Sequence, residues 1–381
     1  MSSSALFAPL QVRSLCLKNR IVISPMMQHA APGGFANHWH LVHLGKFALG
    51  GAALVLTEST AVSPVGRIGR DDAGLWDDAH VAPWKEVVDF VHAHGAAIGV
   101  QLGHAGRKAG SKALWEGGEA LSEAQMAEAD PRWVRIGPSA VAAGEGWSVP
   151  RAMSGADIEE VVAQFAAAAR RADAAGFDVV ELHFGHGYLA ASFLSPLSNL
   201  RTDEHGGSRE GRMRLALRIA REVRAAWPGD KPLWCRLSVV DGAVGGWGVE
   251  DSIALVRQLQ DCGVDVIDCS SGGLTEQTRA LPVPRGLGFQ VPFARQVRSA
   301  TGVLTQAVGM IVEPRQAEEI VASGAADLVA IGREALYDPY WPLHAQAALQ
   351  PDPQFGDWHL RHRVWLQKRQ LVLDRLKGAA D

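Results

Sequence analysis

Residues 154–188 read SGADIEEVVAQFAAAARRADAAGFDVVELHFGHGY. Over residues 156–175 the apolar side chains recur with the period of an amphipathic helix. Ser154 and Asp157 resemble a capping box at its start, and Gly176 supplies a stop. The apolar run that follows is typical of a buried strand. A helix that leads straight into such a strand indicates a parallel α/β arrangement.

The same alternation recurs along the whole chain. A second helix is expected over residues 249–262, with Gly263 as its stop. Short apolar runs typical of strands occur at residues 21–24, 53–58, 97–101, 179–182, 233–238, 266–269, 303–308 and 328–331. Eight parallel strands with helices between them favour a single closed (β/α)8 barrel, the TIM-barrel fold, over an open sheet.

Three segments fall outside this rhythm. Residues 10–12 and 15–17 are expected to form an N-terminal β-hairpin that closes the bottom of the barrel. Residues 106–154 are too long for an ordinary connection after the third strand and indicate an excursion over one barrel face, either a substrate lid or a plain surface loop. Residues 350–381 form a C-terminal helical tail. We expect residues 1–381 to make one domain.

Composition excludes several classes of protein. The 381 residues are 47% hydrophobic and 20% charged, which suits a large buried core, and the formal net charge is −4. No basic field is present to attract nucleic acid or an anionic membrane surface. The absence of a leader-like segment or a long apolar run predicts a cytoplasmic protein, and the four scattered cysteines are expected to be reduced thiols.

His183, His186 and Tyr188 come together where the fourth strand ends. Two imidazoles can donate hydrogen bonds to one carbonyl or nitro oxygen, and a nearby phenol can deliver a proton. The pattern therefore predicts a site that polarises an unsaturated molecule. Two alternatives are buried histidines that only satisfy carbonyls, and a zinc site, for which a third protein ligand is missing. We expect no metal.

Polar residues also follow the other strands, at the end of the barrel where active sites form. Ser24, Pro25, Met26 and Met27 follow the first strand; Glu58 and Ser59 close the second; Gln101 closes the third. Arg236 lies within the fifth strand, where a buried guanidinium needs an anionic or electron-rich partner. The alternative for Arg236 is a structural ion pair with Asp241 or another carboxylate.

Gly309 follows the seventh expected strand, and Gly332 and Arg333 follow the eighth. These residues therefore lie at the C-terminal ends of the strands. Loops after these two strands commonly hold a phosphate group, so the sequence predicts a phosphorylated ligand; glycines used only for tight turns are the alternative. No GxGxxG or GxxxxGK[ST] motif is present, which argues against a permanently bound dinucleotide or nucleoside triphosphate.

Taken in order, the motifs resemble those of the Old Yellow Enzyme family of FMN-dependent ene-reductases, and most closely its xenobiotic-reductase-like bacterial branch. The segments that carry the resemblance are NRIVISPM (19–26), QLGHAGRK (101–108), HFGHGYL (183–189), SPLSNLRTD (195–203), GGS (206–208) and IGR (331–333). They span roughly residues 5–345.

The resemblance implies roles for these residues. FMN would be bound by Ser24, Pro25, Met26, Met27, Ser59, Gln101 and Arg236, with its phosphate held by Gly309, Gly332 and Arg333. His183 and His186 would bind the oxygen of the activating group, and Tyr188 would protonate the substrate carbon. NADH or NADPH would visit to reduce FMN, which then transfers hydride to an activated C=C bond of a small molecule. A homodimer or homotetramer would be in keeping with the family.

The chain departs from the family pattern at Met27 and His29, where the branch commonly has a cysteine and a tyrosine. Methionine lacks the S–H donor and is bulkier, so flavin potential and substrate choice should both shift. The tail also departs: Trp365 or Arg369 could shape a substrate pocket, or Trp358, Trp365 and Leu366 could pack the last helix on the barrel.

Four other functions are alternatives to ene-reduction. The same superfamily includes quinone and nitro reductases, as well as flavin-dependent dehydrogenases and demethylases. A non-flavin barrel lyase would need a Schiff-base lysine or a metal cluster, and none of the expected strand ends carries a lysine. A ligand-binding protein without activity would not need His183, His186 and Tyr188 together.

Overall fold

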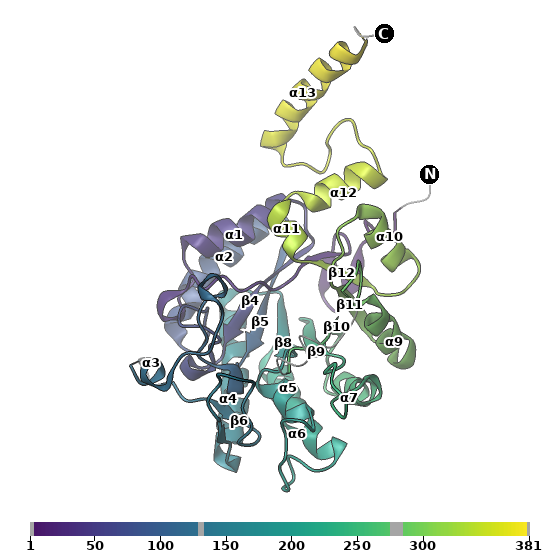
Figure 1. The fold of residues 1–381 in the computed structure, drawn as a ribbon. Helices are drawn as coiled ribbons and strands as arrows, with labels where there is room; N and C mark the ends of the chain where they lie inside the picture. The colour runs from purple at the N-terminus through teal and green to yellow at the C-terminus, as the bar shows by residue number, and fades with distance from the viewer. Residues whose placement is uncertain (1–3, 129–132, 275–284, 379–381) are drawn as a thin grey trace.

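A computed structural model describes residues 4–128, 133–274 and 285–378. Eight parallel strands close into a barrel, in the spatial order β10-β11-β12-β3-β4-β5-β8-β9 (Figure 1). The strands are β3 (Ile21–Ile23), β4 (Leu54–Ala61), β5 (Ala97–Gly103), β8 (Val179–Phe184), β9 (Leu233–Ser238), β10 (Val266–Ser270), β11 (Leu304–Val308) and β12 (Leu328–Ile331). All eight strands that the sequence indicated are therefore confirmed.

Helices cover the outside of the barrel. They are α1 (His38–Leu49), α2 (Val81–Ala93), α4 (Gly155–Ala175), α5 (Leu189–Leu194), α6 (Arg209–Ala226), α7 (Val249–Asp261), α9 (Val291–Thr301), α10 (Pro314–Ala322), α11 (Arg333–Tyr337) and α12 (Trp341–Leu349). The capping box of α4 is present, because Ser154 Oγ accepts a hydrogen bond from Asp157 N at 3.2 Å. Gly176 ends α4 at φ 91° and Gly263 follows α7 at φ 83°, both in the left-handed region that glycine favours.

The expected N-terminal hairpin closes one end of the barrel. Strands β1 (Leu10–Val12) and β2 (Leu15–Leu17) pair antiparallel. Val12 and Leu17 pack in one buried cluster with side chains from the starts of the barrel strands, namely Val22, Ala53, Leu54, Leu56, Val179, Trp234, Val266 and Leu328. The bottom of the barrel interior is therefore an apolar plug.

Further along the strands the inward-facing side chains become polar. Because alternate residues face the same side of a strand, the inward series are Val179, Glu181 and His183 on β8, Trp234, Arg236 and Ser238 on β9, and Val266, Asp268 and Ser270 on β10. Each series starts in the apolar plug and ends at the barrel mouth. The inward-facing polar residues of these three strands are thus collected toward the C-terminal ends of the strands.

The segment after β5 makes the expected excursion. It contains the short helix α3 (Glu123–Ala127) and the strand pair β6 (Ile136–Gly137) and β7 (Arg151–Ala152). Ala105, Ala109, Leu121, Met126 and Trp133 form a small core of their own, against which Val65, Ile68 and Tyr188 pack. The segment is therefore anchored beside Tyr188, although residues 129–132 of the expected 106–154 excursion lie outside the described residues.

The last helix of the C-terminal tail does not pack on the barrel. Helix α13 (Leu360–Gly378) stands away from the barrel beyond α12 (Figure 1). Trp358 stacks on Tyr340 with ring centroids 5.4 Å apart, but the Trp365 side chain is 68% exposed. The expectation that Trp365 packs the last helix on the barrel is therefore wrong, because the turn at residues 350–359 directs α13 outward.

The described residues contain no candidate for a membrane-spanning helix or a metal-binding cluster. Within them, no helix is both long and apolar enough to cross a bilayer, and no three His, Cys, Asp or Glu side chains are grouped to bind a metal ion. All four cysteines are free thiols, and only Cys16 is exposed.

Candidate active site

A tight turn after β8 brings His183, His186 and Tyr188 together, as the sequence predicted. His186 and Gly187 both adopt positive φ values, 57° and 72°. The His183 and His186 rings meet edge to face with centroids 5.0 Å apart, and His183 meets Tyr188 with centroids 5.1 Å apart. A side chain at Gly187 would collide with the backbone at Gly273, so the turn requires glycine.

His183 is buried and His186 is half-buried, and both are held among polar groups. His186 Nε2 lies 2.7 Å from Ser270 Oγ, and His186 Nδ1 lies 3.3 Å from His183 Nε2. Burial, reinforced by the positive charge of Arg236, lowers the pKa of both imidazoles well below the usual histidine value. Two neutral rings therefore stand at the barrel mouth, each able to donate one hydrogen bond.

Lys108 lies at the same site, although sequence reasoning did not place it there. It belongs to the 3-10 turn η4 (Gly106–Lys108) that follows β5. Its Nζ donates a 2.9 Å hydrogen bond to His186 O, donates another to Gly273 O, and lies 5.8 Å from the centroid of the Tyr188 ring. A lysine is therefore present at the mouth, although none of the expected strand ends carries one. Lys108 lies five residues beyond the end of β5, and it reaches the mouth through the turn that follows the strand.

A row of buried polar side chains lies beneath the histidines. Arg236 Nε lies 3.3 Å from Asp268 Oδ2, and Arg236 Nη1 donates to Ser24 Oγ at 3.3 Å. The carboxylate partner of Arg236 is thus Asp268. Asp241, the partner considered from sequence, instead accepts hydrogen bonds from Ser195 Oγ and Trp247 N.

Two carboxyl groups in this row were missed by sequence reasoning. Gln101 Nε2 donates to Glu181 Oε1 at 2.8 Å, and both Glu181 and Asp268 are fully buried. Burial raises the pKa of both carboxyl groups, and the charge of Asp268 raises that of Glu181 further while Arg236 opposes the shift. The signal that could have found them is the alternation of inward positions: Glu181 lies two residues before His183, and Asp268 lies opposite Arg236 in register.

The ends of β11 and β12 form a second hollow. A cavity of about 170 Å³ is lined by Val308, Gly309, Met310, Ile311, Val312, Ala330, Gly332, Arg333 and Glu334. Gly309 has φ 115°, and a Cβ there would lie 2.8 Å from Gln290 Nε2. Arg333 Nη2 donates to Met310 Sδ at 3.2 Å, a weak acceptor for a guanidinium. The predicted set of Gly309, Gly332 and Arg333 is thus assembled around one hollow.

The remaining predicted ligands of a flavin lie between the two sites. Ser24 N donates to Ile331 O at 3.0 Å, and Met26 lies beside Gly332. Pro25 lies between them and is half-buried. Ser59 pairs with Gln101 in register, just after an irregularity in the β4–β5 ladder. Ser24, Gln101, Arg236 and Gly332 therefore surround one mouth.

The residues present fit a bound flavin mononucleotide. His183 Nδ1 is buried and has no hydrogen-bond partner among the described residues, which is costly unless a ligand supplies one. Arg236 and Gln101 supply donors for an electron-rich ring, and the Gly309 hollow with Arg333 has the form of an anion site.

A separate cavity of about 170 Å³ opens beside Tyr188, and several predicted substrate residues line it. Its wall is formed by Met27, His29, Ile68, Lys108, Ser111, Lys112, Leu114, Gly118, Ala143, Trp147 and Tyr188. Trp365, another predicted substrate residue, lies on the outward-directed α13 and not in this cavity of its own chain.

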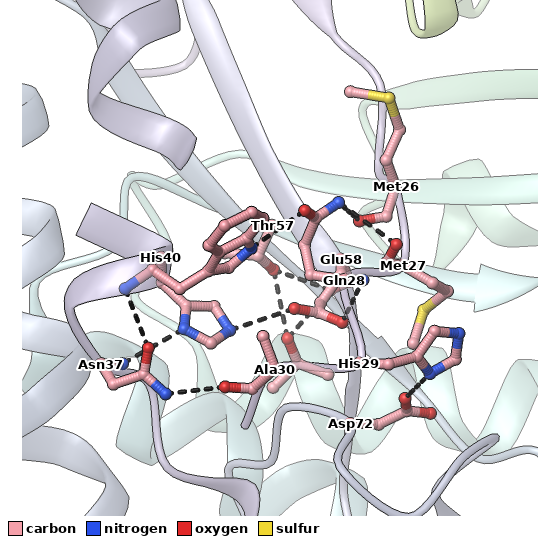
Figure 2. Close-up of polar contacts among 12 residues, drawn as sticks. Met26, Met27, Gln28, His29, Ala30, Asn37, His40, Thr57, Glu58 and Asp72 are labelled. Atoms are coloured by element: carbon pink, nitrogen blue, oxygen red, sulfur yellow. Dashed lines mark hydrogen bonds and ion pairs between the residues drawn. The ribbon is translucent and has the colours of Figure 1, made fainter. Parts of the chain in front are cut away.

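Buried hydrogen bonds fix the loop that carries Met27 and His29 (Figure 2). Glu58 accepts a 2.9 Å hydrogen bond from Gln28 N, and its other oxygen lies 3.1 Å from His40 Nε2. His29 Nδ1 lies 2.6 Å from Asp72 Oδ1. The loop after β3 is thus tied to β4 by Glu58 and to the following loop by Asp72.

Comparison with known proteins gives one consistent family. A model of the NADH:flavin oxidoreductase / NADH oxidase family matches residues 5–352. An NADPH dehydrogenase from Geobacillus thermodenitrificans is 43% identical over 349 residues, which cover 91% of this chain and 95% of the relative. An NADPH dehydrogenase from Bacillus subtilis is 40% identical over 350 residues, which cover 91% and 96%. These relatives are not named as xenobiotic reductases, so they do not carry the expected likeness to that branch.

Solved structures agree on the fold. Morphinone reductase in complex with tetrahydroNAD matches with a TM-score of 0.75 at 28% identity, covering 92% of this chain and 93% of the other. A 2-naphthoyl-CoA reductase matches with a TM-score of 0.80 at 24% identity and 53% coverage of its own chain, which supports the fold alone.

Proposed function

We propose, from the premise that this chain belongs to the NADH:flavin oxidoreductase / NADH oxidase family, that it is an NADPH-consuming ene-reductase with FMN as its cofactor. The family is the Old Yellow Enzyme family that the motifs resembled, and it makes the chain a flavin-dependent oxidoreductase. The names of the relatives support NADPH as the reductant. Residues 1–381 would act as one FMN-binding domain.

The chain offers FMN a complete set of ligands. Ser24, Pro25, Met26, Met27, Ser59, Gln101 and Arg236 would hold the ring, and Gly309, Gly332 and Arg333 would hold the phosphate. Bound FMN would supply a carrier that takes a hydride from the nicotinamide and passes it to the substrate. The positive charge of Arg236 favours negative charge on a ring beside it.

The neutral histidine pair is the observation that carries this proposal. His183 and His186 are kept uncharged by burial, and a carbonyl oxygen that replaces the 3.3 Å contact between His183 Nε2 and His186 Nδ1 would accept one hydrogen bond from each of these atoms, with Ser270 Oγ remaining on His186 Nε2. That interaction draws electron density away from the conjugated C=C bond and favours attack at its β-carbon. Tyr188, in edge contact with His183, would supply the proton to the α-carbon.

The wall of the cavity supports a second candidate within the same superfamily. Met27 and His29 replace the cysteine and tyrosine of the resembled branch, so a quinone or nitro group, or a substrate to be oxidised as in dehydrogenases and demethylases, would meet a different surface. Lys108 does not favour a Schiff-base lyase, because its Nζ donates to two backbone carbonyl groups and is not left free to attack a substrate carbonyl.

A short series of measurements tests the proposal. The purified protein should show the visible spectrum of oxidised FMN, NADPH should bleach it without oxygen, and a cyclic enone should restore it. A colourless protein that takes up no FMN would refute the flavin assignment. Reoxidation by quinones or nitro compounds but not by enones would refute ene-reduction while leaving a flavin reductase.

A further inference from the structure

The cavity beside Tyr188 has an uneven distribution of charge. Three basic side chains, His29, Lys108 and Lys112, line it, and none of its lining residues is acidic. The nearest carboxylate partner of Lys112 is Glu119, outside the lining, with Oε2 3.0 Å from Lys112 Nζ in an ion pair that is exposed to solvent and can exchange for a ligand carboxylate. Apart from Ser111, the rest of the wall is apolar or aromatic and includes Ile68, Leu114 and Trp147. A neutral enone would contact mainly the apolar part of such a cavity. The basic side chains are better suited to a ligand that also carries a negative charge.

His29 is aimed at the cavity by its partner. Asp72 is buried, with one oxygen 2.6 Å from His29 Nδ1 and the other accepting a 2.6 Å hydrogen bond from Gly69 N. This carboxylate cannot turn away, so it fixes the ring and leaves Nε2 on the side opposite Asp72 (Figure 2). The edge of the Trp115 ring system supports the imidazole from the excursion, at a centroid distance of 5.6 Å.

The charges that face His29 come from three parts of the chain. Asp72 and Asp71 lie in the loop after β4, Glu58 lies in β4 itself, and Lys108 and Lys112 lie across the cavity on the excursion. Burial alone would lower the pKa of His29, but the hydrogen bond to Asp72 and the charges of Asp72, Glu58 and Asp71 together raise it. His29 therefore carries a proton on Nε2 more readily than a free histidine does.

We propose that this cavity selects unsaturated carbonyl compounds that also carry a carboxylate, and that His29 and Lys112 bind that carboxylate. The imidazolium and the ammonium each give a hydrogen bond in which donor and acceptor are both charged, whereas a neutral phenol at position 29 would bring no positive charge to the carboxylate. The carbon skeleton of the acceptor lies against Ile68, Leu114 and Trp147. The inference rests on the proposed function, because it names the class of acceptor for the same site.

Binding of saturated ligands tests the proposal apart from turnover. 4-Oxopentanoate and its methyl ester share a carbonyl and differ in charge, and neither has a C=C bond to reduce. Each is titrated into the FMN-loaded, oxidised protein, and the dissociation constant is read from the change in the flavin absorption spectrum. We expect the acid to bind roughly tenfold or more tightly than the ester near pH 6.5, the range for a hydrogen bond between charged groups.

Variants separate His29 from a general charge effect. His29→Gln and Lys112→Met should each remove most of the preference for the acid. His92→Gln is the matched control, because His92 makes another His–Asp contact, 2.7 Å from Asp178, between α2 and the segment before β8, away from this cavity. Thermal melting of each variant shows that it is folded.

The pH dependence has a defined sign. The preference for the acid should fall as the pH rises through the raised pKa of His29, and Asp72→Asn should move that fall to lower pH. Equal binding of acid and ester, or an unchanged preference in both His29→Gln and Lys112→Met, overturns the proposal. If the wild-type protein still reduces a neutral enone in that case, the proposed function stands; failure to take up FMN overturns both.

Discussion

Gly187 lies between His186 and Tyr188, and replacing it by alanine tests whether the turn after β8 sets the position of the predicted proton donor. A Cβ there would lie 2.4 Å from the Gly273 carbonyl oxygen and 2.6 Å from Leu274 Cα, whereas ordinary contact begins at 3.4 Å. Both neighbours are backbone atoms, so the turn and the segment after β10 must separate by about 1 Å.

A displacement of this size should be visible in the acceptor half-reaction. A misplacement of about 1 Å can cost roughly a hundredfold in rate when reacting groups must be aligned. Alanine at φ 72° also carries backbone strain of about 1–2 kcal/mol, which lowers stability. We therefore expect Gly187→Ala to slow reoxidation of the NADPH-reduced enzyme by 2-cyclohexenone about a hundredfold, measured by stopped-flow absorbance.

Gly302→Ala separates strain from collision. Gly302 has φ 71° at the end of α9, and a Cβ there would meet no atom within 4 Å. It should lose similar stability and keep the wild-type reoxidation rate. If Gly187→Ala folds and reoxidises within about threefold of the wild-type rate, then the turn does not position Tyr188 as argued.

Three other predictions concern the flavin, the titration of buried histidines and a helix cap. Met27→Cys should change the flavin midpoint potential, measured by reductive titration against a reference dye; an unchanged potential with an unchanged acceptor profile would contradict the role given to Met27. Burial lowers the pKa of His43 and His104 to about 4 and also lowers that of His183 and His186, so the unfolded chain binds more protons below its own pKa of about 6.5. These four histidines should therefore lower the free energy of unfolding as the pH drops from about 7 to 5, while the raised pKa values of His29, Glu181 and Asp268 act in the opposite direction. The loss of stability toward low pH should be smaller in His104→Asn than in the wild type, and an equal loss would refute the assignment. Ser154→Ala removes the cap of α4 and should cost about 1 kcal/mol in chemical denaturation, with no change in the rate of FMN reduction; a stability equal to wild type would show that the cap contributes nothing.

The barrel was predictable because its determinants are local. Each strand is a short apolar run, and α4 carries its own cap at Ser154 and its own stop at Gly176. The cluster of His183, His186 and Tyr188 was predictable for the same reason, since it occupies one turn. In these regions a few neighbouring residues decide the structure.

The parts that sequence reasoning missed depend on contacts between distant residues. Asp268 becomes the partner of Arg236 only through the register of β9 and β10, and Lys108 reaches Tyr188 only because the chain turns after β5. The outward course of α13 becomes visible only when the segment between α12 and α13 is placed in space. None of these follows from periodicity along a single segment.

The apolar plug beneath the polar row gives the barrel the form of a cup, closed at the hairpin and open at the mouth. Because the plug below Glu181 and Asp268 is apolar, we expect these two buried carboxyl groups to exchange protons with solvent from the mouth side. A ligand that covers the mouth should therefore hold these two carboxyl groups in the protonation state they had when it bound. We therefore expect Glu181 and Asp268 to take up or release protons when the ligand binds or leaves, and not while it is bound.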